Sequence, residues 1–330
     1  MRKYHDGVGD LPFGWTAECA LQNLRRLLPD TIIHLGTEAE FAAGTFAHAR
    51  VLLAGFAPRE LLRQVPKVEW IQFSGSGSDH FFKASRLSPR DYLAAGVKIL
   101  NSPGISKYPV AEHVLAMMLA LARGVPRAVR QQADREWTIF FVPELRRKTL
   151  GIIGLGEIGE RVAELARVFG MHVIGCKRDP DRHLGFAHRV VGTGKMDEVI
   201  AEADYLVLLT PLSKGTAGLF DLATFKQMKP SAYFINASRG ENVNEADLAQ
   251  ALRSGVIAGA AVDTFGPIAL DDPKKLEALR PDSPLWGLPN MLVVPNNAAS
   301  SEYYMEYFAS AVADNYQRWR AGEPFRSVAA

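Results

Sequence analysis

The chain has 330 residues, of which 48% are hydrophobic and 22% charged, and its formal net charge is +2. This balance excludes an intrinsically disordered chain and a basic nucleic-acid-binding protein, and no apolar run is long enough for a membrane span or a signal peptide. The length suits two domains, and two widely separated cysteines, Cys19 and Cys176, favour a reduced cytoplasmic setting without a metal site.

The first hundred residues alternate short apolar runs with helical patterns, which is typical of a parallel α/β domain. Gly75-Ser76-Gly77 follows one of the apolar runs, and its backbone N–H groups could bind a substrate carboxylate. The predicted strands are 31–35, 51–54, 70–73 and 97–100, and the predicted helices are 58–65 and 89–95.

A charged stretch from Ala128 to Arg147 follows a long apolar helix predicted over 110–123. It carries Trp137, Phe140 and Phe141 and does not have the pattern of a sheet. Exposed aromatic side chains of this kind favour an arm or lid that packs on a second subunit.

The segment from Thr149 to Pro180, TLGIIGLGEIGERVAELARVFGMHVIGCKRDP, has the order strand, glycine turn, helix, strand. Gly154, Gly156 and Gly159 have G-x-G-x-x-G spacing. The first glycine allows a tight turn, the second lets a pyrophosphate approach the backbone, and the third lets the helix pack on the strand. The helix N-terminus then offers free N–H groups and a favourable dipole to the phosphates. The segment predicts dinucleotide binding.

The residues after the second strand indicate which dinucleotide is bound. An NAD site usually carries Asp or Glu about twenty residues after the glycines, to accept hydrogen bonds from the ribose 2′-hydroxyl. Here the chain has Cys176, Lys177 and Arg178 before its first carboxylate, Asp179. Arg178 suits a 2′-phosphate through its planar fork, and Lys177 as a point charge. We expect NADP, with NAD as the alternative if Asp179 turns inward.

The remaining strands are predicted to end at one edge of a parallel sheet, where ligands bind in open α/β folds. The most informative strand end is Arg239, because a guanidinium there could clamp a carboxylate and the neighbouring keto oxygen. Asp263 follows a strand so apolar that its carboxylate needs a specific partner, either the nicotinamide amide or a backbone N–H. Strands are predicted at 205–209, 232–236, 259–262 and 291–294, and a final helix, 302–320, returns to the first domain.

Ordered motifs over most of the chain resemble the D-isomer-specific 2-hydroxyacid dehydrogenase family, which includes glyoxylate/hydroxypyruvate reductases and phosphoglycerate and formate dehydrogenases. The matching segments are SGSGSDH at 74–80, VAEHVLAMMLAL at 110–121, TLGIIGLGEIG at 149–159, LLTPLSKGTAGLF at 208–220, INASRGENVNEADLAQAL at 235–252, AAVDTF at 260–265 and SPLWGLPNMLVVP at 283–295.

The resemblance implies two Rossmann-like domains of parallel sheets flanked by helices, with the active site in the interdomain cleft and a homodimer joined through the cofactor domain. The substrate domain would be residues 1–102 with 297–330, and the dinucleotide-binding domain 103–296. The expected substrate is a small 2-oxo acid, bound by Gly75, Ser76, Gly77 and Arg239. The expected cofactor contacts are Gly154, Gly156, Glu157, Ile158, Gly159, Lys177, Arg178, Thr210, Pro211, Thr216, Ala237, Ser238, Asp263 and Asn296.

The chain departs from the family at its acid–base centre. The family has a catalytic histidine directly after the proline of its last strand, but Pro295 is followed by Asn296. The glutamate that orients this histidine in the family falls at Ile268, and no histidine follows His188. Asparagine can donate a hydrogen bond but cannot supply a proton near neutrality. The usual acid–base pair is therefore absent.

Three interpretations remain. Another group could supply the proton, with Lys107 and Tyr108 as the main candidates and His80, Tyr303 or Tyr304 as weaker ones. Asn296 could instead polarise a carbonyl as an oxyanion donor. Finally, the chain could be a nucleotide-binding regulatory or sensor protein with little or no turnover. The retained Arg239 and Asp263 favour an enzyme, and His113, on an apolar helix, is interpreted as a structural histidine.

Overall fold

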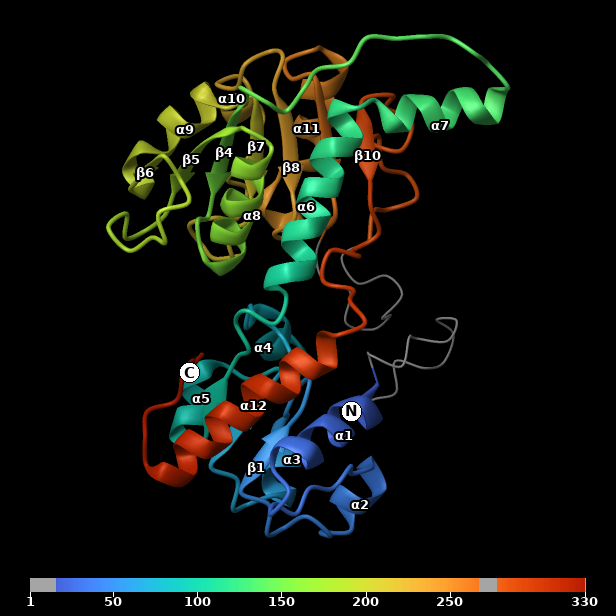
Figure 1. Cartoon of the computed structure of the whole chain (residues 1–330). Coiled ribbons are helices and arrows are strands. Elements are labelled where there is room, and N and C mark those ends of the chain that lie inside the picture. Colours follow the sequence, from blue (N-terminus) through green and yellow to red (C-terminus); the bar gives the residue numbers. More distant parts are fainter. Residues whose placement is uncertain (1–15, 267–277, 330) are drawn as a thin grey trace. The chain divides into compact units, whose positions relative to one another are not determined.

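The computed structural model describes residues 16–266 and 278–329, which fall into two compact units (Figure 1). The divisions lie between Ser106 and Lys107 and between Ala299 and Ser300. We call the parts before and after these divisions together unit 1, and the continuous segment between them unit 2. Among the described residues, no helix is long and apolar enough to cross a membrane.

In the part of unit 1 that the structure describes, three parallel strands lie in the order β1-β2-β3. Phe73 and Phe81 stack in its core at 4.8 Å between ring centroids, and the buried Tyr92 hydroxyl donates to the Ala57 carbonyl. The last helix, α12, packs on α1, so the end of the chain completes this unit. Its elements are α1 (Ala17–Leu27), α2 (Glu38–Ala42), β1 (Val51–Leu53), α3 (Arg59–Gln64), β2 (Trp70–Gln72), α4 (Asp79–Ser85), α5 (Pro89–Ala94), β3 (Lys98–Leu100) and α12 (Tyr304–Ala321).

The strand predicted at 31–35 is wrong. The segment pairs with no strand among the described residues, and Ile32 is 85% exposed. An apolar run of this length predicts a strand only when a sheet or core covers its side chains. Here the side chains of Ile32 and Leu35 face solvent, so the run lacks the burial that would order it.

The described residues of unit 2 form seven parallel strands in the order β10-β9-β8-β7-β4-β5-β6. The chain enters the sheet at β4, winds outward through β5 and β6, and then returns to β4's other side with β7. This is the doubly wound topology, whose order reverses between β4 and β7. Its elements are α6 (Lys107–Ala122), α7 (Val125–Asp134), β4 (Thr149–Ile153), α8 (Glu157–Val168), β5 (His172–Cys176), β6 (Arg189–Val191), η2 (Thr193–Lys195), α9 (Met196–Glu202), β7 (Tyr205–Leu208), α10 (Leu222–Phe225), β8 (Tyr233–Asn236), η3 (Gly240–Asn242), α11 (Glu245–Arg253), β9 (Gly259–Val262) and β10 (Met291–Val293).

Helices cover both faces of the unit 2 sheet. Val114 of α6 and Val162 of α8 are in one buried cluster, and Val199 of α9 and Leu248 of α11 are in another. Strands buried on both faces have continuous apolar sequences, and the four residues of β7 are all buried. The predicted α/β fold with parallel sheets flanked by helices is confirmed.

Candidate active site

The glycine turn between β4 and α8 has a different geometric reason for each glycine. Gly154 has φ +103°, and a Cβ there would lie 2.7 Å from the Leu209 carbonyl carbon, at the end of β7. A Cβ on Gly159 would lie 2.7 Å from the Gly154 carbonyl oxygen. At Gly156, by contrast, an added Cβ would meet no atom within 4 Å in the described chain. The turn is therefore closed at its first and third glycines and open at its second.

The open glycine also begins helix α8. Gly156 is the N-cap, and no side chain caps the helix, so the first-turn N–H groups, including those of Glu157 and Ile158, are not taken by a capping group. The turn lies where the strand order reverses, beside the end of β7. An open approach, uncapped N–H groups and the positive end of a helix dipole fit a pyrophosphate at this place.

Polar side chains link the carboxyl ends of β7 and β8. Asn242 donates from Nδ2 to the Thr210 carbonyl at 3.0 Å and to Ser238 Oγ at 3.1 Å. Asn236 accepts the Ser238 hydroxyl at 2.6 Å and its N–H at 3.0 Å. In the loop after β7, Thr216 donates to the Pro211 carbonyl at 2.7 Å. Hydrogen bonds therefore link several predicted cofactor contacts at this edge of the sheet, namely Thr210, Pro211, Thr216 and Ser238. The half-buried Ala237 lies beside them in the chain.

Arg239 lies at the same edge, after β8. Its side chain is half-buried, and Nη1 donates to the Ser238 carbonyl at 2.8 Å. The following Gly240 is required by packing, because a Cβ there would lie 2.3 Å from the Phe265 carbonyl carbon. The guanidinium is thus held close to its own backbone, with a glycine next to it.

Asp263 anchors the segment that contains Asn296. The Asp263 carboxylate is buried; Oδ1 accepts the Asn297 N–H at 2.8 Å and both oxygens accept the Ala298 N–H at 3.2 Å. The Asn296 N–H donates to the Asp263 carbonyl at 2.9 Å. Of the two partners expected for this carboxylate, the structure contains the backbone N–H groups.

Two further features surround this anchor. Asn296 itself has φ +53°, in the left-handed region that asparagine tolerates better than most residues. The His113 imidazole approaches from α6, with Nε2 3.4 Å from Asp263 Oδ1. His113 Nε2 is buried and makes no hydrogen bond to any described residue, so its main neighbour is the carboxylate. The position of the family's orienting glutamate, Ile268, lies outside the described residues.

The basic segment after β5 holds Lys177 and Arg178 in different environments. Lys177 Nζ donates to the Arg182 carbonyl and lies 3.9 Å from Glu160 Oε1 of α8. Arg178 is exposed, and its guanidinium has no ion pair or hydrogen bond within the described part of the chain. Just before them, burial raises the pKa of the Cys176 thiol, which fits a packing residue.

The remaining candidates, for carboxylate binding and for proton transfer, are distributed over both units. In unit 1, the turn Gly75–Gly77 is half-buried; Asn101 Nδ2 donates to the Ser76 carbonyl at 2.7 Å, and the Tyr304 hydroxyl donates to the Ser74 carbonyl. His80 lies near Asp79, and Tyr303 is 50% exposed. In unit 2, Lys107 and Tyr108 begin α6. Lys107 Nζ and the Arg161 guanidinium each lie 5.4 Å from the Tyr108 ring centroid.

The arrangement of β4, its glycine turn and the neighbouring strand ends has counterparts in known proteins. Residues 115–298 match the family model described as "D-isomer specific 2-hydroxyacid dehydrogenase, NAD binding domain". This chain belongs to the D-isomer specific 2-hydroxyacid dehydrogenase family. The family expected from the sequence motifs is confirmed.

Individual relatives differ in length from this member of the family. It is 31% identical over 306 residues to glyoxylate/hydroxypyruvate reductase B of Klebsiella pneumoniae, covering 90% of this chain and 87% of that protein. It is 33% identical over 302 residues to D-3-phosphoglycerate dehydrogenase of Archaeoglobus fulgidus, covering 83% of this chain and 54% of the relative. The chain spans about half the length of the D-3-phosphoglycerate dehydrogenases that it matches.

Among solved structures, this dehydrogenase family member is similar to a probable 2-hydroxyacid dehydrogenase of Rhizobium etli, crystallised with NADP, HEPES and L(+)-tartaric acid. The TM-score is 0.76 and the identity 28%, with 96% of this chain and 95% of that chain covered.

Sequence reasoning missed two residues near the site. The sequence predicts a structural histidine at position 113 but not its contact with Asp263, which its imidazole approaches to 3.4 Å. Glu160 was not considered, although its carboxylate is buried directly after the third glycine. The available signal for Glu160 was its position on the apolar face of an amphipathic helix, where a charged residue is unusual. No local signal links His113 to Asp263, which are far apart in the chain.

Proposed function

We propose that this chain is an NADP(H)-preferring oxidoreductase that transfers a hydride between a nicotinamide and a small 2-oxo or 2-hydroxy acid, with Asn296 at the usual histidine position. The observation that carries the proposal is the carboxyl edge of the unit 2 sheet. There the open glycine turn, Arg239 and the Asp263–Asn296 anchor follow neighbouring or nearby strands.

The chain's residues have distinct roles in this proposal. NADPH supplies the hydride when it is bound. The turn at Gly156 and the start of α8 would hold its pyrophosphate, and the edge from Thr210 to Ser238 would contact its nicotinamide half. Arg239 binds the acid's carboxylate and polarises its keto oxygen. In unit 1 we assign the N–H groups of Gly75–Gly77 to a carboxylate as well.

The proton is the unusual part of the proposed chemistry. Asn296 can donate an amide hydrogen bond to a developing oxyanion but cannot release a proton. The other proposed participants are Tyr108, whose ring has two cations at 5.4 Å, and Lys107, one of those cations. Either can deliver a proton directly or through water, in place of the histidine that is typical of the family.

The preference for NADP rests on the charge after β5. Arg178 is exposed and carries a planar fork that matches a phosphate, and the Rhizobium relative was crystallised with NADP. The first carboxylate of this segment, Asp179, is exposed as well, so NAD binding is the competing outcome.

The test is oxidation of NADPH and of NADH, followed by absorbance, against a panel of 2-oxo acids. We expect the wild type to use NADPH in preference to NADH. An Asn296→His variant should turn over faster by roughly 10²–10⁴-fold if the proton limits the rate. Histidine tolerates the left-handed backbone at this position, so the variant should fold. An inert wild type that cannot bind NADPH would contradict the proposal.

The amide at position 296 also supports a second candidate, a nucleotide-binding regulatory or sensor protein. In that case the wild type binds NADPH but oxidises none of it with any 2-oxo acid, while the Asn296→His variant gains activity. The same experiment therefore separates the two candidates.

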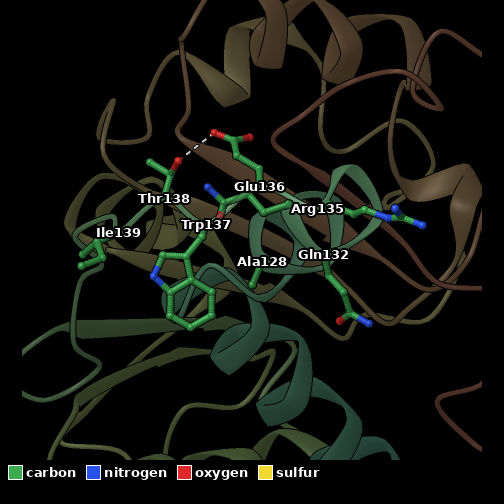
Figure 2. A pocket seen from close by; sticks show the side chains of 8 residues that line it. Ala128, Gln132, Arg135, Glu136, Trp137, Thr138 and Ile139 are labelled. Atoms are coloured by element: carbon green, nitrogen blue, oxygen red, sulfur yellow. Dashed lines mark hydrogen bonds between the residues drawn. The ribbon is translucent and has the colours of Figure 1, made fainter.

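We also propose that unit 2 forms a homodimer through its arm, residues 135–142. Trp137, Ile139 and Phe141 are 95%, 88% and 104% exposed, whereas Phe140 turns inward onto Arg127 at 4.4 Å. The alternation leaves one face of an extended segment apolar and bare. Figure 2 shows Trp137 and Ile139 among the side chains that line a hollow in unit 2. The volume of this hollow is about 530 Å³. A patch of this kind is rare on a monomer and suits a second copy of the chain.

The proposed setting is the cytoplasm, because both cysteines are unpaired and buried, as in a reducing compartment.

A further inference from the structure

A buried carboxylate lies directly behind the cofactor turn. Glu160, in the first turn of α8, is 3% exposed, although glutamate is almost never buried without partners. Its Oε1 accepts the Leu184 N–H at 3.1 Å and lies 3.9 Å from Lys177 Nζ. Its Oε2 is buried and makes no hydrogen bond to a described residue. Among the described residues, the groups that offset the cost of burying this carboxylate are Lys177, the Leu184 N–H and the N-terminus of α8.

These contacts reach both ends of one loop. Lys177 directly follows β5, and Leu184 lies near the return toward β6. Lys177 Nζ also donates to the Arg182 carbonyl, and Arg167 Nη1 of α8 donates to the Gly185 carbonyl at 3.2 Å. The loop from 177 to 185 is therefore tied at several points to helix α8, whose N-terminus is the proposed pyrophosphate site.

We propose that Glu160 is a positioning residue for cofactor selection: it holds the 177–185 loop through Lys177 and Leu184, so that Arg178, and not Lys177, binds the 2′-phosphate. This inference rests on the proposed NADP preference and deepens it. The Lys177 ammonium is turned to the Glu160 carboxylate and to the Arg182 carbonyl. The Arg178 guanidinium beside it is exposed and has no such partner among described residues.

Charge alone and loop positioning predict opposite results for Glu160. Removing a negative charge near a phosphate site should tighten NADPH binding by electrostatics alone. If Glu160 positions the loop, Glu160→Gln should weaken NADPH binding instead. The glutamine can still accept the Leu184 N–H but no longer pairs with the Lys177 ammonium. The sign of the change therefore separates the two explanations.

The experiment measures the Kd of NADPH and of NADH for the full chain, over a range of ionic strength. The variants are Glu160→Gln, Lys177→Met, their double variant and Arg178→Ala. Arg178→Ala should weaken NADPH at least about tenfold and flatten its salt dependence, with little effect on NADH. Glu160→Gln and Lys177→Met should each weaken NADPH by about three- to tenfold. The double variant should bind NADPH no more weakly than the weaker-binding of the two single variants, because the two side chains act as a pair.

Glu164→Gln is the matched control. Glu164 lies one turn further along α8 and pairs with Arg161 at 2.7 Å, so its loss should leave both dissociation constants unchanged. Hydrogen exchange at the Leu184 amide gives an independent readout, and it should accelerate in Glu160→Gln and in Lys177→Met because the loop loses the same ion pair in both variants. Lys177→Met therefore keeps the inference testable if Glu160→Gln folds poorly.

Three outcomes would overturn the inference. The first is tighter or unchanged NADPH binding in Glu160→Gln. The second is equal weakening of NADPH and NADH, which indicates a general structural role. The third is a flattened salt dependence in Lys177→Met, which makes Lys177 itself a phosphate contact. A wild type without NADPH preference, or an Arg178→Ala variant with an unchanged NADPH-to-NADH ratio, would instead contradict the proposed function, and Leu184 exchange would still report on Glu160.

Discussion

At the scale of single residues, the sequence left two possible partners open for the Asp263 carboxylate. Its position after an apolar strand indicated a carboxylate with a specific partner, and either a cofactor amide or a backbone N–H would have satisfied that. The structure contains N–H groups of Asn297 and Ala298, with His113 at 3.4 Å. Asp263 therefore fixes the backbone on which Asn296 stands, whatever it later contacts.

Replacing Asp263 should show this anchoring role as a loss of stability. Asp263→Ala leaves two N–H groups without an acceptor and should lower the free energy of unfolding by about 2–4 kcal/mol. Asp263→Asn retains one acceptor oxygen and should cost less. Urea unfolding measures both, with the exposed Asp282→Ala as a control within about 0.5 kcal/mol of the wild type. Equal free energies of unfolding for Asp263→Ala and the control would show that these hydrogen bonds do not stabilise the fold.

The same comparison shows where residue-level prediction stops. The motif spacing placed Asn296 after Pro295, but only the folded chain shows its φ of +53°. The approach of His113 to Asp263 requires α6 to cross the face of the sheet near β9. Such a contact depends on packing between segments that no local pattern connects.

At the scale of elements, the β4–turn–α8 unit was the part best predicted from sequence. The apolar run, the glycines and the helical period follow one another without interruption, and β4 and α8 lie where they were expected. Short or exposed segments were predicted wrongly, as at 31–35, or not predicted at all, as at β6. Residues 31–35 are not buried, and β6 is a three-residue edge strand with an exposed arginine at its start. Neither has enough buried apolar positions to determine its structure from the sequence.

Two alanine substitutions should separate folding from binding within this turn. Gly156→Ala adds a methyl group to open space and should leave the melting temperature nearly unchanged, yet weaken NADPH binding at least about tenfold because the pyrophosphate needs that space. Gly159→Ala places a methyl 2.7 Å from the Gly154 carbonyl oxygen and should destabilise the unit itself.

Thermal unfolding and NADPH titration of both variants provide the measurement. Gly192→Ala, where an added methyl also meets no atom within 4 Å of the described chain, is the control for a harmless substitution. If Gly156→Ala bound NADPH as tightly as the control does, the pyrophosphate would have to lie elsewhere.

At the scale of the whole molecule, the arm of unit 2 determines the expected assembly. Trp137→Glu with Phe141→Glu should convert a concentration-dependent dimer into a monomer, because two charges would have to be buried in an apolar contact. Light scattering after size-exclusion chromatography measures the mass. Val328→Glu, an exposed apolar residue of unit 1, is the control. A monomeric wild type at every concentration would refute the dimer.

The parallel sheet of unit 2 was predicted from runs of apolar sequence separated by helices, and the resemblance to the family implied it as well, whereas the strand order comes from the structure alone. The division into units follows less directly. The sequence placed the boundaries at 102/103 and 296/297, and the structure divides at 106/107 and 299/300. A connecting segment has no periodicity of its own. The exact boundary between the units therefore depends on which unit the segment packs against.

The chain leaves unit 1 at Ser106 and returns to it at Ser300, and this order has a consequence during synthesis. The seven described strands of unit 2 emerge from the ribosome before α12 is made. Only then can Trp319 reach Trp70, at 6.3 Å between ring centroids, and Asn315 reach Gln72 at 3.2 Å. We expect unit 2 to be able to fold during translation. Unit 1 cannot be completed at that stage, because Trp70 is not yet covered by α12. We therefore expect the first part of the nascent chain to be prone to aggregation until α12 has been made.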